Sequence, residues 1–165
     1  MGYRSDVRII MSKNAFKQFK ENVLDHVKKY KSELPDGAIA KDYHYDMLKD
    51  LDINSNFDDS GDQVYFGWNY VKWYDGYEDV DAIMDSLDKL EEQGYGYNYA
   101  RIGEEYDDIE EKYVDATEKD GINYIDCIDI NRSFDDDYML NRITKDIEPE
   151  MWGVFLCREL WNVYM

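Results

Sequence analysis

The chain has 165 residues, 44% of them apolar and including 16 Tyr, 4 Trp and 6 Phe, and its formal net charge is −19 at pH 7. This apolar and aromatic content excludes an intrinsically disordered chain, and the length predicts a single domain over residues 1–165. The charge disfavours direct binding to nucleic acid or to an anionic membrane, and it favours a basic partner.

A strand followed by a long amphipathic helix is predicted at the start of the chain. RSDVRIIMS alternates apolar and polar residues, which is the period of a strand. In SKNAFKQFKENVLDHVKKYKSEL, apolar residues recur at helical spacing, and Ser12 or Asn14 can accept the N-cap hydrogen bond. The lysines of this segment lie off the apolar stripe, so we expect a helix with a basic outer face.

Residues 36–62 have the weakest pattern, and we interpret them as an insertion into the domain. A short helix over 43–51 fits them, followed by a polar turn. The turn resembles the start of an EF-hand loop, but Phe57 stands where Gly is required and Gln63 where a bidentate Glu is required. We therefore predict a turn and no calcium site. The next segment, 64–74, is aromatic on both faces, which predicts a strand covered on both sides.

The segment DVDAIMDSLDKLEEQG predicts a second helix, with a buried apolar stripe and with Gly94 at the C-cap. Its outer face is a row of carboxylates at i, i+4, i+7 and i+11: Asp81, Asp85, Asp88 and Glu92. Like charges at this spacing destabilise a helix by a few tenths of a kcal/mol each. The row is therefore a small local cost that folding does not require.

Strand patterns dominate the next part of the chain. YGYNYARIGEE and IEEKYV predict a hairpin, 122–134 predicts a further strand, and 135–165 predicts a C-terminal helical extension. The order of elements predicts an α+β fold: an antiparallel sheet of about four to six strands with two or three helices packed mainly on one face. A ferredoxin-like arrangement is one version of this fold.

Residues that commonly carry catalysis are sparse, and we expect no enzyme activity, no metal and no cofactor. His26 and His44 are the only histidines, and no nucleophile or phosphate-binding motif is present. A metal-dependent enzyme that uses the carboxylates of 104–111 is a third hypothesis only. Cys127 and Cys157 lie thirty positions apart without a CxxC pattern, so we expect free, buried thiols. No apolar run is long enough to span a membrane, and we expect a cytoplasmic protein.

Acidic residues are concentrated in 75–120, which contain seventeen Asp and Glu against four Lys and Arg. Adjacent carboxylates on a helix face lie about 6 Å apart, and DNA presents phosphates at comparable intervals along a strand. We predict a partner-binding surface made of Glu78, Asp81, Asp85, Asp88, Glu92, Glu104, Glu105, Asp107, Asp108, Glu110 and Glu111. Its predicted aromatic anchors are Tyr74, Tyr77, Tyr95 and Tyr106.

Three segments, MGYRSDV, VKWYDGYEDV and YARIGEEYDDIEE, resemble a family of small uncharacterised proteins from phages and prophages, whose members share an MGYRS start and WYDGY-like and RIGE-like segments. The resemblance covers about half the chain and brings no activity with it. It implies a phage setting, where small acidic proteins act on host defence, as anti-CRISPR proteins do, or on host transcription.

Two functional hypotheses follow. In the first, the protein inhibits a host nucleic-acid-binding protein, such as a defence nuclease or a polymerase, by mimicking DNA with its carboxylates. In the alternative, it is a non-catalytic structural or accessory module that self-associates as a homodimer through its aromatic strands, and its acidity serves solubility.

Arg101 has two interpretations of its own. It can pair with Asp75 or Glu104 inside the fold. Alternatively, Arg4, Trp73 and Arg101 converge with Glu104 on a small anionic ligand.

Overall fold

The computed structural model describes residues 2–35, 47–56 and 60–141. Predictions made for 36–46, 57–59 and 142–165 lie outside the described residues. The elements, in chain order, are β1 (Ser5–Ser12), α1 (Lys13–Glu33), η2 (Met47–Lys49), β2 (Ile53–Asn56), β3 (Gln63–Val71), α2 (Glu78–Glu92), β4 (Tyr97–Ile102), β5 (Ile109–Val114), η3 (Glu118–Asp120) and α3 (Asp136–Asn141).

The five strands form one sheet in the order β2-β3-β1-β4-β5, and every neighbouring pair is antiparallel. α1 connects β1 to β2, and β3 lies between these two strands in the sheet. Likewise, α2 connects β3 to β4, and β1 lies between those two strands. Two such split β–α–β units are the ferredoxin-like arrangement, and β5 extends it at one edge. The predicted α+β class, with an antiparallel sheet of four to six strands, is confirmed.

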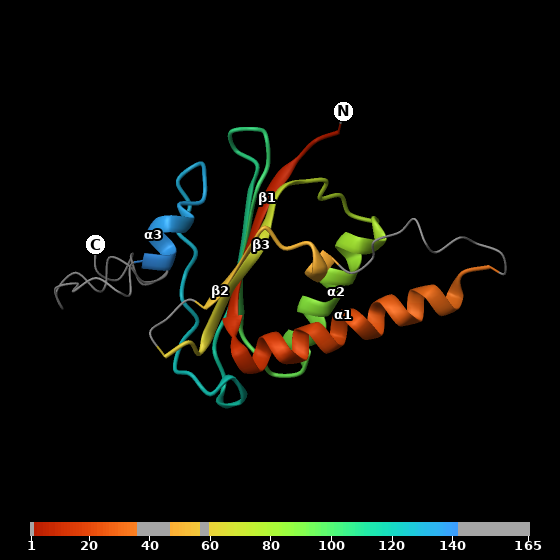
Figure 1. The fold of residues 1–165 in the computed structure, drawn as a ribbon, viewed down its shortest axis with the longest axis horizontal. Coiled ribbons are helices and arrows are strands. Elements are labelled where there is room, and N and C mark those ends of the chain that lie inside the picture. Colours follow the sequence, from red (N-terminus) through yellow and green to blue (C-terminus); the bar gives the residue numbers. More distant parts are fainter. Residues whose placement is uncertain (1, 36–46, 57–59, 142–165) are drawn as a thin grey trace.

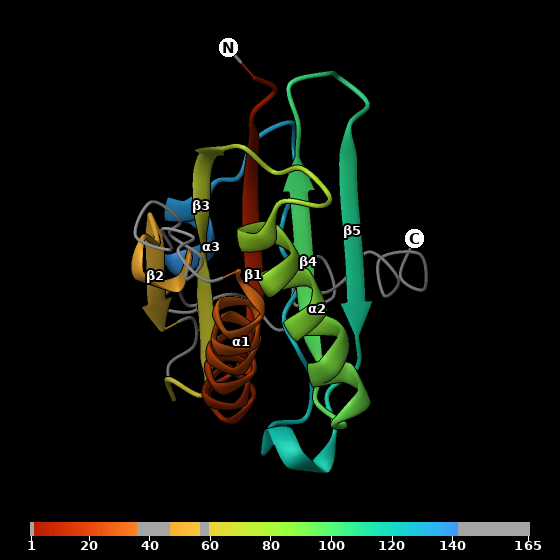
Figure 2. The same cartoon turned by 90° about the vertical axis from the view of Figure 1, so that its right-hand side faces the viewer.

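Helices α1 and α2 lie side by side on one face of the sheet (Figure 2). The predicted alternation in β1 is confirmed, because Val7, Ile9 and Met11 point to this face and are fully buried. α1 begins where the sequence predicted, since the Ser12 hydroxyl accepts a hydrogen bond from the backbone N–H of Ala15 at 2.9 Å. The apolar stripe of α2 is buried against the same core.

The other face of the sheet is covered by the irregular segment 121–141, which includes α3 (Figure 1). The strand predicted over 122–134 is wrong: apart from one isolated bridge between Ile130 and Phe134, this segment has no strand pairing. The backbone of this segment forms hydrogen bonds with side chains of the sheet and not with the backbone of a neighbouring strand. The Gln63 amide oxygen accepts the Asp126 N–H at 3.0 Å, for example. The isoleucines of this segment therefore indicated correctly that it is buried, but they did not indicate whether it pairs as a strand.

A buried arginine fastens this segment to the sheet. Arg8 is 2% exposed, and its guanidinium donates two hydrogen bonds of 3.0 Å to Asp136 at the start of α3. The Tyr65 hydroxyl donates to the same carboxylate at 2.6 Å. Burial alone would raise the pKa of Asp136, but the bonds from Arg8 and Tyr65 outweigh it and hold this pKa below its ordinary value. The molecule thus has three layers: two helices, the sheet, and segment 121–141.

Three smaller predictions have definite outcomes. Only η2 forms in the described part of the helix predicted over 43–51. β2, which lies within the predicted insertion 36–62, pairs with β3 as an edge strand of the sheet. The expectation of a free, buried thiol is wrong for Cys127, which is partly exposed and disulfide-bonded. No helix in the described ranges has both the length and the hydropathy to cross a membrane.

Candidate functional site

The predicted acidic surface is divided between α2 and the β4–β5 hairpin, and strand β5 of the hairpin is connected to α2 through Lys112 (Figure 2). Residues directly opposite in an antiparallel pair point to the same face, so Glu110 and Lys112 of β5 share the helix-covered face with the β4 residues that they oppose. The Lys112 ammonium donates to Glu91 of α2 at 2.6 Å and lies 3.5 Å from Asp88. This ammonium joins β5 to the carboxylate row of α2.

The carboxylates of α2 fall into two groups with different physical roles. Glu78, Asp79 and Asp81 occupy the first turn, where negative charge stabilises a helix through its dipole. Asp81 also accepts the backbone N–H of Gly76 at 3.0 Å. The second group, Asp85, Asp88, Glu91 and Glu92, lies in the later turns. There the helix dipole gives carboxylates no support, and at the last turn it opposes them.

The second group is open to solvent. The side chains of Asp85 and Asp88 are 65% and 69% exposed. Within the described residues, the Lys112 ammonium pairs with Asp88 and Glu91, and the His26 Nδ1 lies 3.8 Å from Asp85. Most of the negative charge of this group therefore faces water.

Arg101 of β4 organises the carboxylates of the hairpin. Its guanidinium donates to both oxygens of Asp108, at 2.6 and 3.0 Å, and to Glu110 at 3.0 Å. It also donates to the Ser5 hydroxyl at 3.1 Å. Hydrogen bonds from Arg101 and Tyr3 lower the pKa of Asp108. Pairing of Arg101 inside the fold is therefore correct, but its partners are Asp108 and Glu110 and not Asp75 or Glu104.

The predicted site for a small anionic ligand is not supported, because Arg101, its central cation, is bound to other residues of the protein. All three guanidinium nitrogens of Arg101 donate to protein oxygens. Glu104 accepts the backbone N–H of Arg4 at 2.7 Å. Trp73 packs in the core, with its ring centroid 6.5 Å from that of Tyr99. The side chains that were expected to meet a ligand are thus engaged within the protein.

The three segments that carry the resemblance meet at one end of the sheet. The Tyr3 hydroxyl donates to Asp108 at 2.6 Å and accepts the Glu105 N–H at 2.9 Å, so the first segment binds the third. A Cβ at Gly103 would lie 1.9 Å from Asp108 Oδ2 and 2.5 Å from the Tyr3 hydroxyl, so the glycine makes room for this contact. The second segment reaches the same end, where the Tyr74 hydroxyl lies beside Gly2. Residues of these three segments therefore maintain this part of the fold.

The predicted surface residues divide according to these contacts. Carboxylates with a hydrogen bond or an ion pair in the fold are Asp81, Asp85, Asp88, Glu104, Asp108 and Glu110. Glu92, Glu105 and Asp107 are exposed, and Glu78 is partly exposed; Glu111 is also exposed and has an interaction within the protein. Among the predicted anchors, Tyr106 and Tyr77 are exposed, whereas Tyr74 and Tyr95 are partly buried.

Tyr70 and Arg132 were not among the site residues predicted from the sequence. Tyr70 is 69% exposed although it belongs to the aromatic strand that was predicted to be buried on both faces. The pairing of β3 with β1 shifts register here, because Val7 faces Trp68 whereas Ser5 faces Val71. This bulge turns Tyr70 out of the sheet, and no residue pattern in the strand announces it.

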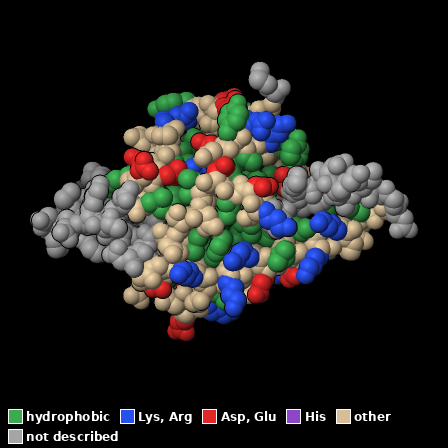
Figure 3. All heavy atoms as spheres, viewed as in Figure 1, with side chains coloured by type: hydrophobic (Ala, Val, Ile, Leu, Met, Phe, Trp, Pro, Cys, Tyr) green, Lys and Arg blue, Asp and Glu red, His purple; other side chains and the backbone are tan. Residues whose placement is uncertain are grey.

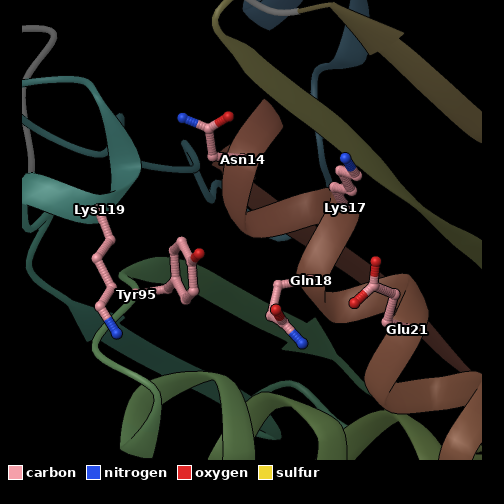
Figure 4. Close-up of a pocket in the computed structure, with 6 residues that line it drawn as sticks. All are labelled: Asn14, Lys17, Gln18, Glu21, Tyr95 and Lys119. Atoms are coloured by element: carbon pink, nitrogen blue, oxygen red, sulfur yellow. The ribbon is translucent and has the colours of Figure 1, made fainter.

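A hollow of about 320 Å³ lies at the opposite end of the molecule, between α1 and the turn after α2 (Figure 4). Its lining residues are Asn14, Lys17, Gln18, Glu21, Tyr95 and Lys119. The Lys119 ammonium donates to the Gln93 carbonyl oxygen at 2.6 Å. In the described part of the chain, no group of three His, Cys, Asp or Glu side chains is placed to hold a metal ion.

The helix layer as a whole carries opposite charges on its two helices. Lys and Arg side chains gather along α1 in the space-filling view (Figure 3), as the basic outer face predicted for this helix requires. α2, its neighbour, has a single Lys among its carboxylates. The carboxylate row of α2 therefore lies beside a helix with a basic outer face.

Comparison of the chain with family models, with curated proteins and with solved structures returned no match in any of the three. The resemblance to phage and prophage proteins therefore stays a prediction, and any functional conclusion must come from the surface itself.

Proposed function

We propose that this protein is a phage-type acidic binding protein that inhibits a host nucleic-acid-binding protein, such as a defence nuclease, by presenting carboxylates in place of DNA phosphates. The observation that carries the proposal is the second half of the α2 row. Asp85, Asp88 and Glu92 are exposed and stand in turns where the helix dipole does not favour them.

These carboxylates work against the stability of the helix that bears them. Like charges one turn apart are unfavourable by about 0.2–0.5 kcal/mol per pair. Carboxylates in the last turn cost a further 0.3–1 kcal/mol, roughly, through the dipole. Solubility alone could be met by Asp and Glu scattered over the surface. A row kept at a cost to the fold supports a role in binding.

The contacts in the fold narrow the proposed surface. Asp108 and Glu110 neutralise Arg101, so they shape the hairpin and contribute less free charge. The carboxylates that would meet a cationic channel are those of the α2 row together with Glu105 and Asp107 at the tip of the hairpin. Pairing with Lys and Arg that normally contact phosphates would make the affinity depend strongly on salt.

The alternative, self-association through aromatic strands, has less support. Tyr65 and Phe66 of β3 are 0% exposed and Trp68 is 2% exposed. These rings fill the core of the fold on both faces of the sheet, so they cannot also form an interface with a second copy.

The proposal is tested by reversing charge on α2 and, as a matched control, on α1. One variant carries Asp85→Lys, Asp88→Lys and Glu92→Lys. The control carries Glu21→Lys, Asp25→Lys and Glu33→Lys; these three residues are also exposed, and the substitutions change the net charge by the same amount. Each protein is titrated into purified host nucleases and polymerases bound to labelled duplex DNA, and DNA release is measured at low and high salt.

Wild type and control should displace DNA, and the α2 variant should lose displacement by at least about tenfold. Circular dichroism must show that both variants fold. Equal displacement by the α2 variant and the control, or displacement that does not change with salt, would contradict the proposal.

A further inference from the structure

β1 begins at the end of the sheet where β3 and β4 end (Figures 1 and 2), and the chain next to this end contains three exposed tyrosines. Tyr106 is 79% exposed, Tyr70 69% and Tyr77 48%. They are three of the five large apolar or aromatic side chains that are exposed in the described parts of the chain. Tyr106 lies in the β4–β5 hairpin, Tyr70 in the β3 bulge and Tyr77 just before α2.

Neighbouring residues connect these rings to one another at this end of the sheet. The Arg4 guanidinium lies 5.3 Å from the centre of the Tyr70 ring, and that of Arg132 lies 4.8 Å from the Tyr106 ring. The Arg4 N–H is bound by Glu104 of the hairpin at 2.7 Å, which joins the two stacked pairs. The Tyr77 ring lies 5.1 Å from Tyr74, whose hydroxyl is beside Gly2. We define Arg4, Tyr70, Tyr74, Tyr77, Tyr106 and Arg132 as the tyrosine–arginine patch.

The backbone of this patch is strained. Tyr70 has a φ of 52° and Arg132 a φ of 57°, and among the described residues no other non-glycine residue has a positive φ. Such conformations are unfavourable for side chains other than Gly, Asn and Asp, and they persist where surrounding contacts enforce them. Here Asp6 accepts the Tyr70 N–H at 2.7 Å, and the Arg132 guanidinium donates to the Glu105 carbonyl at 3.0 Å. At Tyr70 the strained backbone places the aromatic ring in solvent, and this exposure does not stabilise the fold.

Stacking also orders these rings before any partner arrives. A tyrosine held by a cation over its face loses little conformational entropy on binding, which is the reason why rigid Tyr and Arg side chains dominate interface energetics. Glu104, Glu105 and Asp107 flank Tyr106 in the chain, Asp75 and Glu78 flank Tyr77, and all five are exposed or partly exposed. The patch is therefore an aromatic centre with an acidic rim.

We infer that the tyrosine–arginine patch is the anchoring centre for the partner, and that it takes a protein surface with an aromatic or apolar side chain surrounded by Lys and Arg. This inference rests on the proposed function and deepens it, because it separates an aromatic anchor at the sheet end from the charged row on α2. The acidic rim selects a basic partner, and the rings supply contact area that carboxylates lack.

The test uses three labelled synthetic peptides. The first has a central Trp flanked by Arg and Lys, the second has Ala in place of Trp, and the third has Glu in place of every Arg and Lys. Each is titrated against wild type, against a variant with Tyr70→Asn and Tyr106→Ser, and against Tyr124→Asn, an exposed tyrosine that is not part of the patch.

Wild type should bind the Trp peptide about tenfold more tightly than the Ala peptide and should not bind the Glu peptide. The double variant should bind the Trp and Ala peptides equally, while Tyr124→Asn should bind as wild type does. Equal binding of the Trp and Ala peptides by wild type, lost on charge reversal of α2, would overturn this inference and leave the proposed function standing. If neither basic peptide binds, both fail.

The single variant Tyr70→Asn separates binding from folding. Asn adopts a positive φ more readily than Tyr, so its thermal midpoint should equal or exceed that of wild type while its affinity for the Trp peptide falls. A lower midpoint would show that Tyr70 serves the fold, and would overturn its role as an anchor.

Discussion

Replacing Arg101 by Met tests whether the hairpin is held by charge. Arg101 is 9% exposed, and its guanidinium makes four hydrogen bonds. Met keeps an apolar side chain of similar length and removes the guanidinium. Breaking a buried ion pair costs about 3–5 kcal/mol. The carboxylates of Asp108 and Glu110 are 28% and 56% exposed, so water can rehydrate them and reduce this loss. We expect Arg101→Met to lower the free energy of unfolding by about 2 kcal/mol.

For a chain of this length, such a loss lowers the thermal midpoint by about 4–8 °C. The sign of the pH dependence gives a second readout. The pKa of Asp108 is lowered in the folded protein, so its stabilisation is complete above its unfolded pKa of about 3.9 and is lost as the pH falls through the folded pKa. The variant should therefore lose less stability on acidification than wild type.

Urea unfolding followed by circular dichroism, at neutral and acidic pH, measures both effects. The control is the double variant with Asp108→Asn, in which a direct interaction predicts losses that are not additive. A free energy of unfolding within about 0.5 kcal/mol of wild type, together with an unchanged acid profile, would refute this role of Arg101.

Three further predictions concern the fold that supports the site. Gly103→Ala places a Cβ 1.9 Å from Asp108 and should cost about 1–3 kcal/mol in urea unfolding, and wild-type stability would contradict the close contact. Asp136→Ala leaves Arg8 without its carboxylate and should cost about 3 kcal/mol, whereas Asp136→Asn keeps an acceptor oxygen and should cost less; equal losses would show that the hydrogen bonds contribute nothing beyond the charge. Ser12→Ala removes the N-cap of α1 and should lower the thermal midpoint by the equivalent of about 1 kcal/mol, and an unchanged midpoint would contradict the cap.

Local pattern was sufficient for the main elements. The alternation in β1, the apolar stripes of α1 and α2, and the strands of the β4–β5 hairpin were all predicted from residue spacing and are confirmed. These elements are decided by which side chains can leave water together, and spacing along the chain reports this directly. The carboxylate row of α2 follows from the same spacing once the buried stripe of the helix is known.

Spacing failed where long-range contacts compete with local preference. Residues 122–134 have the composition of a strand, yet side chains such as Gln63 bind their backbone and leave no ladder to form. The partners predicted for Arg101 were also wrong. Asp108 reaches Arg101 because the hairpin turns between them, and Gly103 leaves room for the Asp108 side chain.

The sequence by itself determined an α+β domain with a basic first helix, an acidic second helix and a carboxylate-rich hairpin, since each depends on residues within one element. Only the tertiary structure decided the strand order, the burial of Arg8 by segment 121–141, and the tyrosine–arginine patch. The patch brings together residues as distant as Arg4 and Arg132, and it depends on the bulge that turns Tyr70 outward. A bulge is a mismatch between two paired strands, so the sequence of either strand alone does not contain it.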